Sequence, residues 1–303
     1  MKIIVTGASG FIGRVLVEKL LNEGNTVFPI IRANTNKRLL NPKISDYFED
    51  NGDDDKLLKF IQKSHCKGVI HLASYFTGTH NTSDITPLIN SNVHFPTRVI
   101  EASCKANIEW FLNIGTFWEH MNNHAYLPVN LYASTKKAFE AISKFYVEHN
   151  NLKFITVKLN DTYGSNDSRN KFINLWLDIA KHGTVLKMSP GKQMIDIVHV
   201  DDVANALVLS LKRFYSKDFN RDRIEVYSIL SKRKYSLREL ADIFEISIGT
   251  KLNIKWSALP YRNNEIMNPY CPFDLVPEWE QKISIENGFN QLGRDLFLNN
   301  GAN

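Results

Sequence analysis

Short apolar runs alternate with longer amphipathic stretches through the first half of the chain. Apolar runs bounded by polar positions predict strands, and apolar positions that recur every three or four residues predict helices. The predicted strands cover residues 2–6, 26–32, 44–48, 68–72, 110–114 and 154–159. The predicted helices cover residues 11–22, 56–63, 85–106 and 131–146, and a polar surface loop is predicted around residues 34–43. Strands that alternate with helices predict a parallel sheet covered by helices.

The alternation becomes weaker after Gly164. Apolar positions at four-residue spacing follow Asp201 and Asp202, which predicts a helix capped by these acids. Ser236 and Glu239 have the spacing of a capping box, which predicts the start of another helix. The second half therefore contributes a smaller region that differs in pattern from the first.

Composition narrows the class of protein. The chain has 303 residues, of which 43% are hydrophobic and 23% charged, so it can bury a full core. Its net charge of +5 is scattered without a basic, aromatic-interleaved stripe, so we expect no nucleic-acid partner. No stretch approaches the ~20 apolar residues of a membrane span and no signal segment precedes the first strand, so we expect a cytoplasmic protein. Three separated cysteines and the scattered histidines lack metal-ligand spacing, so we expect no metal site.

A glycine-rich loop joins the first predicted strand to the first predicted helix. It reads Thr6-Gly-Ala-Ser-Gly-Phe-Ile-Gly13, and Gly7, Gly10 and Gly13 permit a tight turn and close approach to a pyrophosphate. The helix N-terminus adds unpaired N–H groups and a favourable dipole. This context predicts an α/β fold, a Rossmann-type doubly wound parallel sheet with a smaller, mostly C-terminal substrate-binding region. Residues 1–165, with 194–215 returning, would bind the dinucleotide, and residues 166–193 and 216–303 would bind substrate.

The end of the second predicted strand bears on the choice of nucleotide. NAD-binding proteins usually place an acid there for the ribose 2′-hydroxyl, but this chain has Arg32, with Lys37 and Arg38 close behind. A guanidinium binds a 2′-phosphate with two hydrogen bonds, whereas an acid repels it. The alternative is that Arg32 is only a solvated loop residue. We predict NADP(H) as cofactor, ahead of NAD(H).

A candidate catalytic pair lies on the helix predicted for residues 131–146. Tyr132 and Lys136 are four residues apart and share a face of that helix. A tyrosine titrates near ~10, so acid–base work at neutral pH needs about 3–4 kcal/mol of preferential phenolate stabilisation, which a nearby ammonium and an oxidised nicotinamide can supply together. Thr116 ends the preceding strand at the sheet edge where ligands bind and would hold the substrate oxygen. By spacing alone the pair is ordinary helix surface, and Thr116 an ordinary strand-end hydrogen-bonding residue.

These motifs together resemble a known family. The glycine loop, His71-Leu-Ala-Ser74, Thr116, the Tyr132 and Lys136 pair, Asp161-Thr-Tyr-Gly164 and Asp196-Ile-Val-His-Val-Asp-Asp-Val203 occur in the order seen in extended short-chain dehydrogenase/reductases that act on nucleotide sugars. The resemblance covers nearly the whole chain. Three stretches look most like the CDP-abequose synthase group of 4-keto-6-deoxyhexose reductases: Gly115-Thr-Phe-Trp118, Val129-Asn-Leu-Tyr-Ala-Ser-Thr-Lys136 and Lys158-Leu-Asn-Asp-Thr-Tyr-Gly164.

The resemblance implies roles for individual residues. Five would line the cofactor pyrophosphate: Gly7, Ser9, Gly10, Phe11 and Ile12. Four would contact the inner half of the cofactor: Leu72, Ala73, Ser74 and Asn92. Asp50 would face the adenine, Tyr132 and Lys136 would also contact the cofactor, and Lys136 would hold the nicotinamide ribose. Asp161 would touch the substrate nucleotide, and Arg262 would lie near its diphosphate. Relatives are often dimers, so the resemblance also allows a homodimer.

Three departures from the family pattern affect the interpretation. Dehydratases of the family carry Asp-Glu after the threonine, where this chain has Phe117 and Trp118, so we predict no dehydratase activity. The next residue, Glu119, is predicted to be a surface carboxylate. Many relatives have an arginine that binds the substrate diphosphate where this chain has Ile195. The charge of the diphosphate would therefore have to be neutralised by Lys171, Lys192 or Arg262. Asp161 replaces an asparagine, and it would repel a diphosphate unless it binds a ribose hydroxyl or pairs with a cation such as Lys158.

Other polar and aromatic residues have simpler interpretations. His71 and His199 are predicted to be packed core residues. Phe117, Trp118 and Trp176 would line a sugar pocket or fill the core.

Three functions follow as hypotheses. The leading one is NADPH-dependent reduction of the C4 keto group of a CDP- or dTDP-linked 4-keto-6-deoxyhexose, with Tyr132 as proton donor. The second is a nucleotide-sugar 4-epimerase that retains NAD. The third is a non-catalytic protein that senses a dinucleotide, which would not require an intact Tyr132 and Lys136.

Overall fold

A seven-stranded parallel sheet forms the centre of the molecule. The computed structural model describes residues 1–220 and 224–298. The strands lie in the order β3-β2-β1-β4-β5-β6-β11, and every neighbouring pair is parallel. Their bounds are β1 Lys2–Thr6, β2 Thr26–Arg32, β3 Phe48–Asp50, β4 Gly68–His71, β5 Trp110–Thr116, β6 Lys153–Leu159 and β11 Glu225–Ile229. The predicted parallel sheet is therefore confirmed, and the chain crosses over at β1 as a doubly wound sheet requires.

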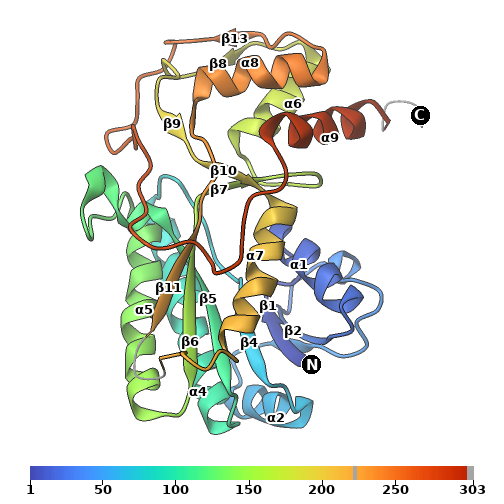
Figure 1. The fold of residues 1–303 in the computed structure, drawn as a ribbon, viewed down its shortest axis with the longest axis vertical. Helices are drawn as coiled ribbons and strands as arrows, with labels where there is room; N and C mark the ends of the chain where they lie inside the picture. The colour runs from blue at the N-terminus through green and yellow to red at the C-terminus, as the bar shows by residue number, and fades with distance from the viewer. Residues whose placement is uncertain (221–223, 299–303) are drawn as a thin grey trace.

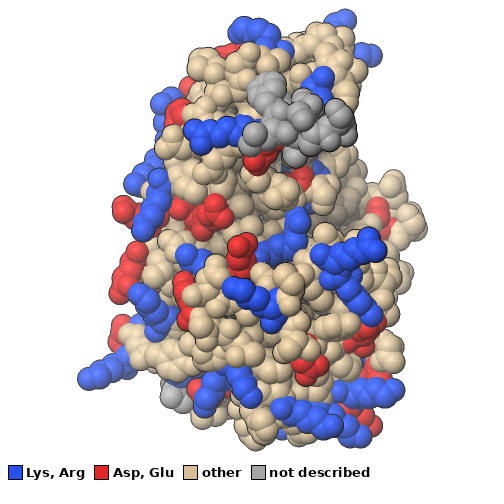
Figure 2. Space-filling view, turned by 90° about the vertical axis from the view of Figure 1, so that its right-hand side faces the viewer, with Lys and Arg blue, Asp and Glu red and all other residues tan. Residues whose placement is uncertain are grey.

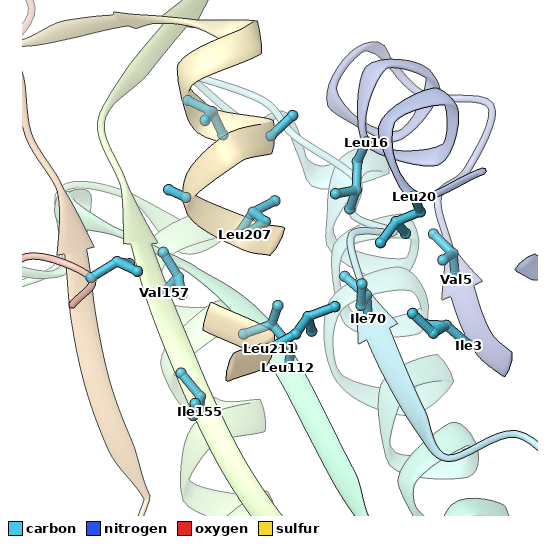
Figure 3. Packing of buried hydrophobic residues seen from close by; sticks show 14 of the residues in the cluster. Ile3, Val5, Leu16, Leu20, Ile70, Leu112, Ile155, Val157, Leu207 and Leu211 are labelled. Atoms are coloured by element: carbon cyan, nitrogen blue, oxygen red, sulfur yellow. The ribbon is translucent and has the colours of Figure 1, made fainter. Parts of the chain in front are cut away.

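Helices cover both faces of this sheet, as Figure 1 shows. On one face lie α1 (Phe11–Asn22) and α7 (Val200–Arg213); on the other lie α2 (Asp54–Ser64), α4 (Phe95–Lys105) and α5 (Leu131–His149). Figure 3 shows Leu16 and Leu20 of α1 and Leu207 and Leu211 of α7 packed over strand residues such as Ile70. All of these side chains are at most 5% exposed. Each buries an amount of apolar surface worth about 1.5–3 kcal/mol relative to exposure to water.

The second half builds a separate core above the carboxyl ends of the central strands (Figure 1). Its helices are α6 (Phe172–His182), α8 (Leu237–Ile248) and α9 (Ile285–Leu298). Short strand pairs accompany them: β7 (Asp161–Tyr163) with β10 (Ile197–His199), β9 (Met194–Ile195) with β12 (Tyr235–Ser236), and β8 (Leu186–Lys187) with β13 (Ile254–Lys255). Trp176 is completely buried in this core against Phe172 and Phe244, so it fills the core rather than lining a sugar pocket.

Most predicted boundaries are within three residues of the observed ones, and two placements need separate comment. The third strand is not at 44–48 but at Phe48–Asp50, where residues 30–32 of β2 provide its partners. The predicted substrate-binding stretch 216–303 contributes β11 to the central sheet, because this strand completes the sheet edge beside β6. The rest of the division into two regions stays a prediction.

The helix predicted for residues 85–106 contains an irregular turn. It consists of α3 (Ile85–Ile89), a π-helical turn (Asn90–His94) and α4, in an unbroken run. A π-helical turn inserts an extra residue into the helix and commonly marks a functional position. Here it lies at Asn92, which is completely buried.

The starts of two later helices show what caps them. Ser236 and Glu239 form the predicted capping box at the start of α8. At α7 the predicted acid caps are wrong, because His199 precedes the helix and its side chain accepts the N–H of Asp201. Asp202 lies inside the first turn and accepts the backbone N–H groups of Lys282 and Ile283. It therefore ties α7 to the C-terminal region.

The remaining elements are short turns, and the surface charge is mixed. Short 3-10 turns occupy Lys37–Leu39, Thr82–Asp84, Phe117–Glu119 and Met121–Asn123. Figure 2 shows basic and acidic side chains interspersed over one face. Within residues 1–220 and 224–298, no helix is long and apolar enough to cross a bilayer, and no cluster of His, Cys, Asp or Glu has the arrangement of a metal site.

Candidate active site

The glycine loop turns sharply between β1 and α1. Gly7 has φ of +71°, and a Cβ there would lie 2.7 Å from the backbone nitrogen of Ala73. A Cβ on Gly13 would lie 2.0 Å from the Gly7 carbonyl oxygen, so both positions require glycine. Gly10 caps α1 without a side-chain hydrogen bond, and the first turn contains no acid. The first N–H groups of α1 are thus available to an anion, which fits the pyrophosphate of a dinucleotide.

A second loop, residues 72–74, lies directly against the first. The Thr6 hydroxyl is 2.8 Å from Nδ1 of His71 and accepts the N–H of Ala73 at 3.2 Å. His71 is completely buried, as predicted for a core histidine, and burial lowers its pKa well below the usual value. The structure therefore brings the predicted residues Leu72 and Ala73 beside the glycine loop.

Asn92 connects this second loop to the helix that carries the candidate catalytic pair. Its Oδ1 accepts the Ser74 hydroxyl at 3.0 Å and the Tyr75 N–H at 2.8 Å. Its Nδ2 donates to the Thr135 hydroxyl of α5 at 3.0 Å and to the Tyr75 carbonyl. The predicted cofactor contact at Asn92 thus coincides with a residue that holds the loop in place.

Asp50, the residue predicted to face the adenine, is engaged in an ion pair beside the end of β2. Arg32 ends β2 as an exposed residue, directly beside Asp50 in the sheet register. Asp50 pairs with Arg98 of α4 at 3.0 Å, and Arg98 also pairs with Asp54. The Arg98 side chain is only 9% exposed. The negative charge of Asp50 is therefore largely compensated beside Arg32, an arrangement that the sequence pattern did not reveal.

Tyr132 and Lys136 lie on the first two turns of α5, which Asn130 caps by accepting the N–H of Ala133. Burial raises the pKa of Tyr132 to about 12, against a smaller lowering by the Ser74 hydroxyl. Burial lowers the pKa of Lys136 to about 8, against upward contributions from Glu140 and Glu119. Lys136 is 2% exposed, and among the described residues no protein atom accepts a hydrogen bond from its ammonium. An acceptor such as a ribose hydroxyl fits there.

Thr116 ends β5, and the turn that follows it carries Trp118, whose ring meets that of Tyr132. Thr116 is 6% exposed, and its hydroxyl accepts the Trp118 N–H at 3.3 Å. That bond caps the 3-10 turn Phe117–Glu119, so the ordinary strand-end role is real. The hydroxyl hydrogen remains available for a substrate oxygen.

Aromatic rings surround the Tyr132 phenol. The Phe76 ring meets it edge-on at 5.0 Å between centroids, and the Trp118 ring does so at 6.4 Å. The Lys171 ammonium lies 4.4 Å from the Phe76 ring centre and 5.6 Å from that of Trp118. It also pairs with Asp161 at 3.0 Å. The cation that compensates the charge of Asp161 is therefore Lys171 and not the expected Lys158. The structure thus brings two predicted substrate residues, Asp161 and Lys171, together beside the rings of Phe76 and Trp118.

Two further basic residues lie near the site. The exposed Arg262 places Nη1 within 3.2 Å of where a Cβ on Gly78 would lie, and that same point is 4.0 Å from the Trp118 ring. Arg169 lies over the Phe11 ring at 4.5 Å and lowers the pKa of Tyr132 slightly by its charge. Sequence reasoning missed Arg169, although its place in a polar loop shortly after Gly164 was a usable signal.

A hollow of about 410 Å³ lies at the loop that follows β7, and Tyr132 does not line it. Residues of the loop after β7, such as Gly164 and Asn166, line it together with Leu292 of α9. Arg14 of α1 donates a hydrogen bond to the Asn166 carbonyl at 2.6 Å, which links the glycine-loop helix to the upper region.

Glu119 is not a surface carboxylate. It is completely buried, and its Oε2 accepts a hydrogen bond from Nζ of Lys158 at 2.8 Å. Lys158 also pairs with Glu140 of α5. The prediction failed because the sequence does not show that β6 places a lysine beneath the 3-10 turn. The spacing of Lys136 and Glu140, four residues apart on one helix face, was the available signal for Glu140.

The parallel sheet, the uncapped glycine loop and the tyrosine–lysine pair at its carboxyl edge define a dinucleotide-dependent enzyme of the dehydrogenase type. The family model described as "NAD dependent epimerase/dehydratase family" matches residues 3–223, and the chain belongs to this family. The predicted extended short-chain dehydrogenase/reductase is confirmed.

Individual relatives cover almost the whole chain. A CDP-abequose synthase of Salmonella typhimurium is 29% identical over 307 residues, covering 97% of this chain and 98% of the relative. One of Salmonella muenchen is 26% identical over 294 residues, with 96% of each chain covered. The Thermotoga maritima UDP-glucose 4-epimerase, solved with UDP-glucose, has a TM-score of 0.85 at 20% identity, with 99% of each chain covered. The Thermus thermophilus UDP-glucose 4-epimerase, solved with NAD, has a TM-score of 0.83 at 18% identity, with 100% of each covered. The two structures show the shared fold.

Proposed function

We propose that the protein is an NADPH-dependent reductase of the C4 keto group of a CDP- or dTDP-linked 4-keto-6-deoxyhexose. Its similarity over full length to CDP-abequose synthases supports this reaction. The bound nicotinamide supplies the hydride. Tyr132 donates a proton to the carbonyl oxygen, which Thr116 holds, and Lys136 stabilises the phenolate that forms.

The residues around Tyr132 are the observation that supports keto reduction rather than dehydration. The rings of Phe76 and Trp118 contact the phenol, and neither can transfer a proton. The nearest acid after Thr116, Glu119, is directed into the core and held by Lys158. Neither Phe117 nor Trp118, the two residues that follow Thr116, can therefore remove a sugar proton and eliminate water, which supports protonation of an oxygen by Tyr132 as the proposed chemistry.

The remaining residues divide into cofactor and substrate roles. In the proposal, Gly7, Ser9, Gly10, Phe11 and Ile12 hold the pyrophosphate, and the loop of residues 72–74 holds the inner half of the nucleotide. The apolar face of the sugar packs against Phe76 and Trp118. Lys171 and Arg262 neutralise the diphosphate in place of the missing arginine at position 195.

The direct test follows NADPH and NADH oxidation by the purified protein with CDP-, dTDP- and GDP-linked 4-keto-6-deoxyhexoses. We expect NADPH loss that depends on a CDP- or dTDP-linked sugar. No oxidation of either nucleotide with any of these sugars would contradict the reductase. If the denatured protein then releases NAD, the 4-epimerase hypothesis takes its place.

Arg32 is expected to set the nucleotide preference. Replacing it with alanine removes charge-assisted hydrogen bonds worth about 1.5–3 kcal/mol, so the KM for NADPH should rise about 10–100-fold while that for NADH changes little. Steady-state kinetics with both nucleotides measures this. Lys43→Ala, in the same polar loop, is the control for a general loss of positive charge. Equal rises for both nucleotides would contradict a role of Arg32 in nucleotide preference, and an unchanged KM for NADPH would reduce Arg32 to a solvated residue at the end of β2.

Lys171 is expected to act on substrate binding. Lys171→Met keeps a long side chain of similar size beside Phe76 but removes the charge over its ring. KM for the nucleotide sugar should therefore rise about tenfold or more, with KM for NADPH unchanged. Asp161 then lacks its cation, which adds to the repulsion of a diphosphate. Lys181→Met, at the other end of α6, is the matched control. An unchanged sugar KM would remove Lys171 from the substrate site.

A further inference from the structure

Three ionisable side chains meet in the core near the catalytic pair. Lys158 and Glu119 are completely buried, and Glu140 is 6% exposed. The Lys158 ammonium donates to Glu119 at 2.8 Å and also contacts Glu140. Lys137 pairs with the second oxygen of Glu140 at 3.1 Å. Burial of ionised groups is costly, so such a network stands out where an apolar core would be more stable.

The backbone provides space for this network. A Cβ on Gly115 would lie 2.6 Å from Cδ of Lys158 and 3.0 Å from Glu140 Oε1. Gly115 and Lys158 are partners in the register of β5 and β6. The lysine therefore crosses the sheet surface at a place that only glycine leaves open.

The network joins the three elements that carry the catalytic candidates. Glu119 closes the 3-10 turn that Thr116 caps. Glu140 lies one turn beyond Lys136 on α5, and Lys158 comes from β6. A displacement of any one of these elements would separate charges in a site of low dielectric constant, so the ionic contacts fix their mutual positions.

The network also lies close enough to act on Lys136 electrostatically. Glu140 and Glu119 favour its charged form, against desolvation and against Lys158. Glu119 also acts on Tyr132. Other titratable groups that face the cluster are Lys137 on α5, His120 after the 3-10 turn and Cys271 in the C-terminal region. His71 on β4 faces Lys136, and Arg169 lies near Tyr132.

We propose that Glu119, Glu140 and Lys158 are positioning residues that keep the Lys136 ammonium charged and in place beneath the nicotinamide ribose. The two carboxylates partly offset the desolvation of Lys136, and Lys158 holds both carboxylates in place. The inference deepens the proposed reductase and rests on the catalytic pair in it, but it does not depend on which sugar is reduced.

The test measures nucleotide binding, because this needs no sugar substrate. Binding of NADPH or NADH, whichever the protein binds more tightly, is followed by fluorescence from pH 6 to pH 10. We expect affinity to fall as Lys136 loses its proton, near pH 8 in the unmodified protein. Glu140→Gln should move this fall to lower pH by about one unit, and Glu119→Gln should move it in the same direction by less.

Controls separate this role from a purely structural one. Glu148→Gln removes a half-exposed carboxylate from the same helix and should leave the pH profile unchanged. Glu140→Asp should restore much of the profile that Glu140→Gln loses, because the charge returns. A lower Tm with an unshifted profile in both glutamine variants would overturn the proposal, as would a binding profile without a fall between pH 6 and pH 10. Failure to reduce any 4-keto sugar would instead refute the reductase alone.

Discussion

Tyr132→Phe should lower kcat/KM for ketone reduction by about 10²–10⁴-fold, because a phenyl ring cannot donate the proton that the developing alkoxide requires. In free-energy terms this is a loss of about 3–5 kcal/mol of transition-state stabilisation. The pKa of Tyr132, raised to about 12 before nucleotide binds, keeps the phenol protonated at working pH, as a proton donor requires.

The structural cost of this change should be small. The Phe76 and Trp118 rings are both nearly perpendicular to the tyrosine ring, and a phenylalanine preserves both contacts. We therefore expect the affinity for NADPH and the Tm to remain close to those of the unmodified protein. Tyr146→Phe makes the same chemical change on the same helix, away from the site, and should retain activity. Near-full turnover by Tyr132→Phe would refute the mechanism.

Most of the fold could be predicted because local patterns and global topology agree. The buried strands of a parallel sheet are short apolar runs, and they stand out between amphipathic helices. The strand at 44–48 was misplaced because residues 48–50 are half-buried at the sheet edge, where the apolar pattern is weak. β11 was missed for a different reason: Glu225 and Tyr227 make it polar in sequence, and Arg213 compensates that polarity only in three dimensions.

The residues of the candidate site also fall into two groups, those that a local motif reveals and those that only the fold reveals. Gly7, Thr116, Tyr132 and Lys136 lie in contiguous motifs, whose chemistry depends on spacing along one element. Residues that act through partners on distant elements carry no such signal. Arg98 compensates Asp50 across 48 positions of the chain, and Lys158 reaches Glu119 across 39. A carboxylate whose partner is distant in sequence has the same appearance as a solvated one, which is why Glu119 was assigned to the surface.

Lys158→Met should destabilise the protein by about 3–5 kcal/mol, the usual cost of removing one partner from a buried ionic group. Methionine has a similar volume, so the loss reflects two carboxylates, Glu119 and Glu140, left without their shared cation. Urea unfolding with an unchanged m-value measures the effect. Lys67→Met breaks an exposed pair with Glu109 and should cost no more than about 1 kcal/mol.

The pH dependence of this loss has a definite sign. Burial and Glu140 already raise the pKa of Glu119, and without Lys158 nothing of comparable strength opposes them. A carboxyl group whose pKa is higher in the folded than in the unfolded state stabilises the fold at low pH, and this contribution is lost as pH rises through the folded-state pKa. The difference in unfolding free energy between Lys158→Met and the unmodified protein should therefore be smaller near pH 5 than near pH 8.

A second substitution separates lost charge compensation from lost packing. Lys158→Met combined with Glu119→Gln leaves one buried carboxylate instead of two, so the double variant should be more stable than Lys158→Met alone, with a coupling of about 1–3 kcal/mol. Additive effects of the two changes would mean that Lys158 acts on the fold through its methylene chain. The destabilisation by Lys158→Met could instead be the same at pH 5 and pH 8 while the coupling between the two substitutions persists. That result would indicate that Glu119 is already protonated beside Lys158, and Glu140 would then be the carboxylate that keeps Lys136 charged.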